Sequence, residues 1–325
     1  MGFSLGKYEM KHGLCLAPMA GYTDRAMRLV CHEAGAEYSV TEMVSAKAVV
    51  YNDKKTFSLA KILSDEGPVA IQIFGSEPSI MAEAAGILLE NCDARPIAID
   101  INMGCPVHKI YSNGEGSALM KNPSLIEKIT RAVRGAIDIP CTVKLRSGIN
   151  KKSINAIECA LAAEEAGASL VCIHGRTREQ MYGGSADREI IKNVKSALHI
   201  PVIANGDILS GEDALAMLRD TSADGIAVGR GAVGNPFIFS EIKAALEGGA
   251  YACPSLEERI DTALRQLRTA IADKGERIAI PEARKQIALY LKSFRGAARI
   301  RAEINRATTY AEVAASLKSA LDYNE

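Results

Sequence analysis

Short runs of apolar residues alternate with longer stretches of helical periodicity through the first three quarters of the chain. The apolar runs are residues 14–17, 38–41, 69–74, 97–102, 141–145, 170–174, 201–204 and 225–229. Between them, helical spacing of apolar residues is clearest in Ile80–Leu89, Leu125–Ile137, Ile154–Ala166 and Ala214–Leu218. Continuous apolar strands that alternate with helices are typical of a parallel sheet covered on both faces. Eight such units within about 250 residues predict a (β/α)8 barrel, the TIM barrel, and the unbroken pattern favours it over an open doubly wound sheet.

The last quarter of the chain has a different pattern. Beyond Ser255 there is no strand-like run, and three stretches have helical spacing: Leu256–Ala272, Glu282–Phe294 and Ala311–Leu321. Ser255 precedes the first of them, as a residue that caps a helix N-terminus does. We therefore expect a barrel domain over residues 1–250 and an all-α helical domain over residues 251–325.

Composition narrows the class of protein. No apolar stretch is long enough to cross a bilayer, and the first residues lack the apolar core of a signal peptide. We therefore expect a cytoplasmic protein that binds no membrane. The eight cysteines form no CxxC pair, and the five histidines do not cluster with them. We expect reduced thiols and no metal site, and we expect a monomer.

Charge is balanced over the whole chain but not locally. Lysine and arginine together number 39, and so do aspartate and glutamate. The segment 284–306, however, contains a single acid, Glu303. Its basic residues are Arg284, Lys285, Lys292, Arg295, Arg299, Arg301 and Arg306. Lys285, Lys292, Arg299 and Arg306 recur every seven residues, which predicts one basic face if a single helix runs through the segment. Because the segment has so few acids, we expect its basic residues to contact phosphates rather than only water.

Polar side chains stand at the carboxyl ends of six predicted strands. In a barrel these ends meet at one mouth, where active sites are built. Polar residues often terminate strands, but six strands ending in this way indicate a site. The residues are Gln72, Asn102, Cys105, Lys144, Arg146, His174, Asn205, Gly229 and Arg230.

Cys105 and Lys144 are the strongest candidates for chemistry. Gly104 allows a tight turn and Pro106 stiffens the exit from it, so that Cys105 is presented on a constrained loop. A thiol placed in this way can act as a nucleophile or as a proton donor. Lys144 lies within an apolar run, so its charge must be paired or must face an anionic ligand such as a reduced flavin.

Glycines at the ends of the seventh and eighth strands indicate a phosphate site. They occur in Asn205-Gly206-Asp207 and Gly229-Arg230-Gly231. Exposed backbone N–H groups beside an arginine suit a phosphate, and barrels often bind phosphate after strands seven and eight. No GxGxxG opens a βαβ unit, which argues against a nicotinamide site of the Rossmann type.

With these residues in view, the chain resembles the tRNA-dihydrouridine synthases. Residues 17–24 (APMAGYTD) are similar to the opening motif of that family, and later motifs match in order at 72–75, 100–106, 143–146, 174–177, 205–207 and 229–231. The resemblance implies FMN at the barrel mouth, with NADPH or NADH as the electron donor. The implied cofactor contacts are Pro18, Met19, Ala20, Gln72, Lys144, His174, Asn205, Gly206, Asp207, Gly229 and Arg230.

The resemblance also implies an activity. The reduced flavin passes a hydride to C6 of a uridine in the D-loop of tRNA, and Cys105 donates a proton to C5, which yields 5,6-dihydrouridine. The implied substrate contacts are Asn102, Arg146, Arg176 and Arg178 at the mouth, and Arg284, Lys285, Lys292, Arg295 and Arg299 in the helical domain.

One residue departs from the family pattern, and two other functions remain as alternatives. Glu115 stands between Gly114 and Gly116, where the family carries a small residue, and an acid there would oppose RNA unless it faces away or pairs with a base. An FMN barrel that acts on free pyrimidines, like dihydroorotate or dihydropyrimidine dehydrogenases, would explain the barrel but not the basic helical domain. A non-catalytic RNA-binding factor would not explain Cys105 and Lys144.

Overall fold

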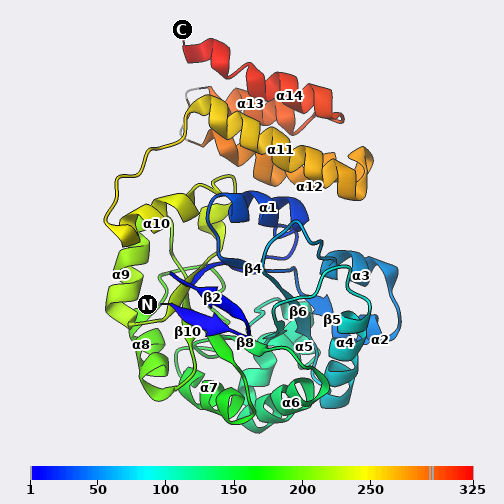
Figure 1. Ribbon diagram of the computed structural model, residues 1–325, viewed down its shortest axis with the longest axis vertical. Helices are drawn as coiled ribbons and strands as arrows, with labels where there is room; N and C mark the ends of the chain where they lie inside the picture. Colours follow the sequence, from blue (N-terminus) through cyan, green and yellow to red (C-terminus); the bar gives the residue numbers. More distant parts are fainter. Residues whose placement is uncertain (1, 293, 295, 325) are drawn as a thin grey trace.

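The computed structural model describes residues 2–292, 294 and 296–324, and within them eight parallel strands form a closed barrel (Figure 1). The strands follow the order β4-β3-β11-β10-β9-β8-β7-β6, and pairing of β4 with β6 closes the ring. The predicted TIM barrel is confirmed, with one strand in each predicted run. The strands are β3 (Leu14–Leu16), β4 (Tyr38–Val40), β6 (Val69–Phe74), β7 (Ile99–Asn102), β8 (Cys141–Arg146), β9 (Leu170–His174), β10 (Val202–Asn205) and β11 (Gly225–Val228), and the unpredicted β5 (Val44–Ser45) pairs with β6.

Helices surround the barrel. Those predicted from periodicity are α4 (Pro78–Glu90), α6 (Pro123–Ala136), α7 (Ala156–Glu165) and α9 (Gly211–Thr221). Helices that the periodicity missed are mostly short or polar; α8, for example, buries only Ile191 and Val194. The missed helices are α1 (Arg25–Glu33), α2 (Ala46–Val50), α3 (Lys54–Ala60), α5 (His108–Ser112), α8 (Arg188–Ala197) and α10 (Ile238–Glu247), with the 3-10 helices η1 (Gly116–Lys121) and η2 (Arg230–Ala232).

Alternation along each strand decides which residues face the barrel interior. Successive strand residues point to opposite faces. In β7, Ile99 and Ile101 join the hydrophobic core beneath the helices, while Asp100 and Asn102 form hydrogen bonds inside the barrel. The sequence therefore places apolar side chains outside the barrel wall and polar ones near its carboxyl end.

An N-terminal hairpin, which the sequence did not predict, covers the amino-terminal end of the barrel. Strands β1 (Phe3–Leu5) and β2 (Tyr8–Met10) pair in antiparallel fashion. Leu5 and Met10 pack against interior residues that include Tyr38 and Ile203. Because this end is filled by side chains, the carboxyl end is where a ligand can enter.

The helical domain lies beside α1 and α10, and α11 packs against α1 (Figure 1). Ser255 caps α11 in a capping box with Glu258, as predicted for the helix start. A hydrophobic core of its own joins the helices of this domain. The elements are α11 (Leu256–Lys274), α12 (Glu276–Ile287), η3 (Ala288–Leu291), α13 (Ala297–Ile304), α14 (Tyr310–Lys318) and η4 (Leu321–Asn324).

The prediction of one helix over Glu282–Phe294, and with it a continuous basic face, is wrong. Helix α12 ends at Ile287, and Lys292 has extended backbone with ψ at 135°. Gly296 then has a φ of 94°, a left-handed conformation that interrupts a helix. Lys285 and Arg299 consequently lie on different helices. Nowhere in the described residues is a helix long and apolar enough to cross a membrane.

Candidate functional site

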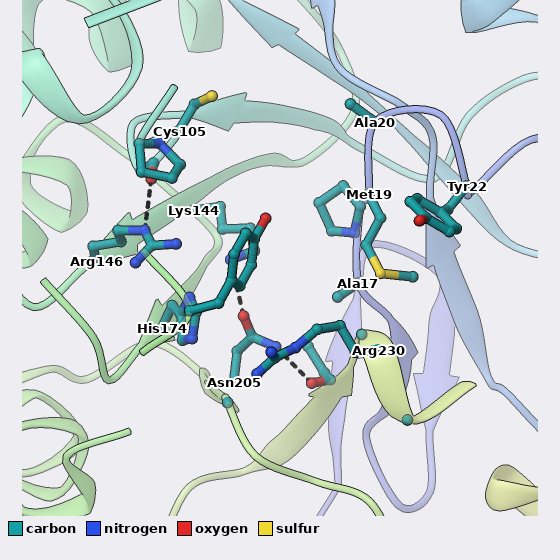
Figure 2. A pocket seen from close by; sticks show the side chains of 18 of the residues that line it. Ala17, Met19, Ala20, Tyr22, Cys105, Lys144, Arg146, His174, Asn205 and Arg230 are labelled. Carbon is teal, nitrogen blue, oxygen red and sulfur yellow. Dashed lines mark hydrogen bonds between the residues drawn. The ribbon is translucent and has the colours of Figure 1, made fainter. Parts of the chain in front are cut away.

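A cavity of about 620 Å³ opens at the carboxyl ends of the strands. It is lined by every residue that the resemblance assigns to the cofactor, together with Cys105, Asn102 and Arg146. Figure 2 shows Cys105 and Arg146 on one side, Met19, Ala20 and Tyr22 on the opposite side, and Asn205 with Arg230 along a third edge. The structure thus brings together residues that are as far apart in sequence as Pro18 and Arg230.

A line of buried hydrogen bonds connects the barrel interior to the Cys105 loop. Gln72 Nε2 donates to Asp100 Oδ2 (2.6 Å), and Gln72 Oε1 accepts from Asn102 Nδ2 (2.8 Å). Asn102 Oδ1 in turn accepts from the backbone N–H of Cys105 (2.8 Å) and of Gly104 (3.2 Å). Because a carboxylate only accepts, Asp100 determines the orientation of both amides, and the Asn102 carbonyl must face the loop.

The Cys105 thiol is suited to donate a proton. Its backbone carbonyl accepts hydrogen bonds from the hydroxyl (2.8 Å) and the N–H (3.1 Å) of Ser117, so the loop is held from both sides. Burial raises the pKa of the thiol, and the Val107 N–H and the charges of Arg146 and Lys144 oppose this rise only in part. The thiol is therefore protonated at neutral pH, the state that a general acid needs.

Glycine is required opposite this cysteine. Gly116 has a φ of +59°, and a Cβ there would lie 2.9 Å from the Cys105 Cβ. Any larger residue would therefore push the Cys105 loop. The neighbouring Glu115 does not line the cavity and is buried. Burial raises the pKa of its carboxyl, and the charge of Lys47, which itself pairs with Glu77 (2.6 Å), lowers it. The acid that departs from the family pattern is therefore not part of the cavity wall.

Positive charge surrounds His174. Burial, and then the charges of Lys144, Arg146, Arg176 and Arg230, lower the pKa of His174 to about 2. The imidazole is therefore neutral over the whole physiological pH range. Among the described residues, the cavity is lined by three cations and one acid: Lys144, Arg146, Arg230 and Asp207. The cavity therefore has a surplus of positive charge, which attracts an anionic ligand.

The low pKa of His174 predicts a loss of stability in acid. The unfolded chain binds a proton near pH 6.5 and the folded site does not, so stability falls as the pH drops below 6.5. Between pH 7 and pH 5 this residue should cost about 2 kcal/mol of unfolding free energy. Urea unfolding of the wild type and of His174→Gln at both pH values tests this. The variant should lose less stability than the wild type, and equal losses would contradict the shift.

The end of the cavity near β10 and β11 combines backbone N–H groups with the charge of an arginine. Gly206 has a φ of +127°, and none of the hydrogen bonds between described residues uses the backbone N–H of Gly206, Asp207 or Gly229. Arg230 is half exposed at this end and lies 3.5 Å from Asp207 Oδ1. Lys144 Nζ donates to Asn205 Oδ1 (3.1 Å), which leaves further N–H groups of its ammonium for a ligand.

The three arginines predicted to bind substrate at the mouth lie in different places. Arg146 lines the cavity, and it donates to Gly104 O (3.0 Å) and thereby also braces the Cys105 loop. Arg176 is only 2% exposed, does not line the cavity, and donates to two loop carbonyls and Asp207. Arg178 is stacked on Tyr111, with 3.8 Å from Cζ to the ring centre. Direct contact of Arg176 with a substrate does not agree with this burial.

The predicted contacts in the helical domain are also dispersed. Arg284 donates to Ala307 O (2.6 Å) and is half-buried, so it holds the domain together. Lys285 lies over the ring of Tyr22, with 4.5 Å from Nζ to the ring centre. Lys292 is exposed, and Arg299 is exposed and pairs with Glu303 (3.0 Å). Arg295 lies outside the described residues.

Several residues of the cavity were missed by the sequence interpretation. Tyr182 and Leu209 lie on loops well beyond the strand ends, and Leu289 comes from η3 of the helical domain. Tyr182 is 56% exposed, and Arg230 lies over its ring at 5.1 Å. An aromatic residue followed by Gly183-Gly184 is a weak loop signal for Tyr182. Leu289 gives no local signal, because only the packing of two domains brings it to the cavity.

The chain is similar to known proteins in its sequence and in its fold. The family model described as Dihydrouridine synthase (Dus) matches residues 15–324. A tRNA-dihydrouridine synthase B of Pseudomonas putida is 40% identical over 303 residues, 93% of this chain and 89% of that protein. A probable tRNA-dihydrouridine synthase of Rickettsia bellii is 39% identical over 303 residues, 93% of this chain and 92% of that protein. The old yellow enzyme homologue of Zymomonas mobilis shares the fold, with a TM-score of 0.53 and 14% identity over 79% of this chain and 95% of that chain.

Proposed function

The chain belongs to the dihydrouridine synthase family, and from this premise we propose that it reduces the C5=C6 bond of uridine in tRNA to 5,6-dihydrouridine with FMN and NADPH or NADH. The observation that carries the proposal is a buried, tightly held thiol at the edge of a cavity that Lys144, Arg146 and Arg230 line at the barrel mouth. A cytoplasmic location, where tRNA is found, and a monomeric state are parts of the same proposal.

The cavity fits FMN in size and in chemistry. Its volume of about 620 Å³ is within the usual range for cofactor sites. The unused N–H groups of Gly206 and Gly229, with Arg230 beside them, would hold the phosphate. Lys144 would stabilise negative charge on the flavin ring system. Bound FMN supplies the hydride that the reduction of C6 requires, and the protein supplies placement and charge.

Cys105 and Asn102 have separate roles at the uracil. Cys105 gives its proton to C5, because burial keeps the thiol protonated until the reaction needs it. Asn102 already holds the Cys105 loop through Oδ1, and its Nδ2 lies 3.5 Å from Met43 Sδ. Sulfur is a weak acceptor, so a carbonyl of the base can replace it and receive this N–H.

The substrate must leave its place in the folded RNA to reach this cavity. A stacked or paired uracil has to be turned out, which needs a hold on the surrounding phosphates. The exposed Lys292 and Arg306, together with Lys285 and Arg299, are the residues of the helical domain that we assign to this hold. They form dispersed points of contact, since no single helix carries them.

One incubation separates this function from its alternatives. The purified protein is mixed with NADPH or NADH and, in parallel, with unmodified tRNA, free uracil or orotate. Dihydrouridine found by mass spectrometry in the tRNA arm alone supports the proposal. Turnover of free pyrimidines without tRNA supports the rival FMN barrel, and a colourless protein that binds tRNA without turnover supports the non-catalytic factor.

Charge reversal at Lys292 is expected to weaken tRNA binding by about five- to tenfold and to reduce the salt dependence of binding by about one counterion. FMN should stay bound, because Lys292 does not line the cavity. Filter binding of Lys292→Glu over a range of salt concentrations measures both effects. Lys128→Glu on α6, across the barrel from the helical domain (Figure 1), is the control. If both variants bind tRNA equally, Lys292 is not a phosphate contact.

A further inference from the structure

The helical domain forms part of the wall of the cofactor cavity. Leu289 of η3 lines the cavity. It packs so closely on Gly234 that a Cβ there would lie 2.5 Å from the Leu289 Cβ, and Gly234 has a φ of +68°. If the helical domain bound only RNA and the barrel bound only the cofactor, the two domains would not need to pack this closely beside the cavity. The edge of the helical domain is therefore placed where it can influence the cofactor.

A buried line of hydrogen bonds runs from inside the helical domain to this wall. The Tyr290 hydroxyl donates to Gln266 Oε1 (2.7 Å), and Gln266 Nε2 donates to Gln286 Oε1 (2.9 Å). Gln286 Nε2 then donates to the backbone carbonyl of Tyr22 in the barrel domain (3.1 Å). Tyr290 is 0% exposed, and both glutamines are 4% exposed. Buried polar groups of this kind are strongly orienting, because a broken link leaves a partner without a hydrogen bond.

The Tyr22 carbonyl belongs to the loop that lines one side of the cavity. Pro18, Met19 and Ala20 face the cavity, and Tyr22 N–H donates back to Met19 O (2.9 Å). The turn is thus compact, and a shift at Tyr22 moves Met19 with it. Lys285, one residue before Gln286, lies over the ring of the same tyrosine. The helical domain holds this loop at its carbonyl and at its side chain.

We propose that Gln286 is a positioning residue for the flavin: through the Tyr22 carbonyl it sets the place of the 18–23 loop, so that the helical domain governs cofactor binding as well as RNA binding. This rests on the proposed function for the identity of the cofactor. The direction of the hydrogen bonds makes the role specific: the Tyr22 carbonyl only accepts, so Gln286 Nε2 must face it and Oε1 must face Gln266.

Two variants test the two ends of this connection. Gln286→Glu keeps an acceptor for Gln266 but, as the ionised carboxylate, offers no donor to Tyr22, and Tyr290→Phe removes only the far hydroxyl. The control is Arg265→Met, which removes a more exposed contact between the same domains, the pair of Arg265 with Glu33. All three are compared with the wild type by FMN titration, by the visible spectrum of the bound flavin, and by hydrogen exchange of the peptide covering residues 17–24 without cofactor.

We expect Gln286→Glu to raise the Kd for FMN by about three- to tenfold, to shift the flavin absorption band and to speed exchange at residues 19–23. Tyr290→Phe should change the same quantities in the same direction by less, and Arg265→Met should change none of them. If Gln286→Glu does not fold, the flavin spectrum and the hydrogen exchange of Tyr290→Phe decide whether the inference holds. A Gln286→Glu variant with the spectrum, FMN affinity and exchange of Arg265→Met overturns the inference. These readouts need no tRNA, so failure of the wild type to make dihydrouridine is a separate result.

Discussion

Replacing Cys105 by alanine is expected to lower the rate of dihydrouridine formation by about 100- to 10,000-fold, the usual contribution of a general acid. Burial raises the pKa of this thiol, so it is the protonated donor that the variant loses. FMN binding and its reduction by NADPH should be nearly unchanged, because neither step needs the proton. Stopped-flow absorbance of the flavin separates this reduction from its reoxidation by tRNA, and only the second should slow.

Cys92→Ala is the matched control for this experiment. Cys92 is a half-buried thiol that does not line the cavity, and its Sγ donates to Leu89 O (3.1 Å). The control should turn over tRNA like the wild type. Full turnover by Cys105→Ala would remove the thiol from the reaction, whereas loss of flavin from that variant would show that Cys105 holds the cofactor instead.

Replacing Asp100 by leucine is expected to lower kcat for tRNA by about 10- to 100-fold, although Asp100 does not line the cavity. Leucine offers no acceptor to Gln72, so the amides of Gln72 and Asn102 lose their fixed orientation and the Cys105 N–H loses its partner. Hydrogen bonds to a charged group contribute about 1.5 to 3 kcal/mol, which corresponds to this range of rates. Single-turnover reduction of tRNA measures the change.

Asp100→Asn provides the rescue that tells positioning from simple destabilisation. Its carbonyl can still accept from Gln72, and the Thr142 hydroxyl, which donates to Asp100 Oδ1 at 2.5 Å, can turn and accept from the new amide. We expect activity within a few-fold of the wild type. Alkylation of Cys105, followed by mass spectrometry of its peptide, should speed up in Asp100→Leu alone. Equal losses of activity in both variants would contradict the role of the hydrogen bonds from Asp100 through Gln72 and Asn102 to Cys105.

The strands and the residues at their ends could be predicted from the sequence because both are local features. Parallel strands are covered by helices, so their outward residues are apolar and the runs around Ile99 and Val202 stand out. The polar side chains that follow them, such as Lys144 and Asn205, share one mouth in any barrel. Helix α8 was missed although its two buried residues, Ile191 and Val194, are spaced as on one helical face.

The direction of long charged side chains could not be predicted in the same way. Arg146 is the last residue of β8 and Arg176 follows β9, yet Arg146 reaches the cavity and Arg176 donates to loop carbonyls and Asp207 instead. The interval of seven between Lys285 and Lys292 suggested one helical face, but η3 and Gly296 break the helix. A side chain with several rotatable bonds finds its partners in the folded protein, and sequence spacing does not contain those partners.

The sequence by itself determined the barrel, the site at its mouth and the presence of a helical domain, since periodicity, glycines and strand ends depend on neighbours along the chain. Only the tertiary structure decided that Leu289 and Gln286 of the helical domain reach the cavity wall and the loop at Tyr22. It also decided that Asp100 orients the loop of Cys105. These contacts join segments far apart in sequence, and they exist because burial requires each polar group to find a partner wherever the fold has brought one near.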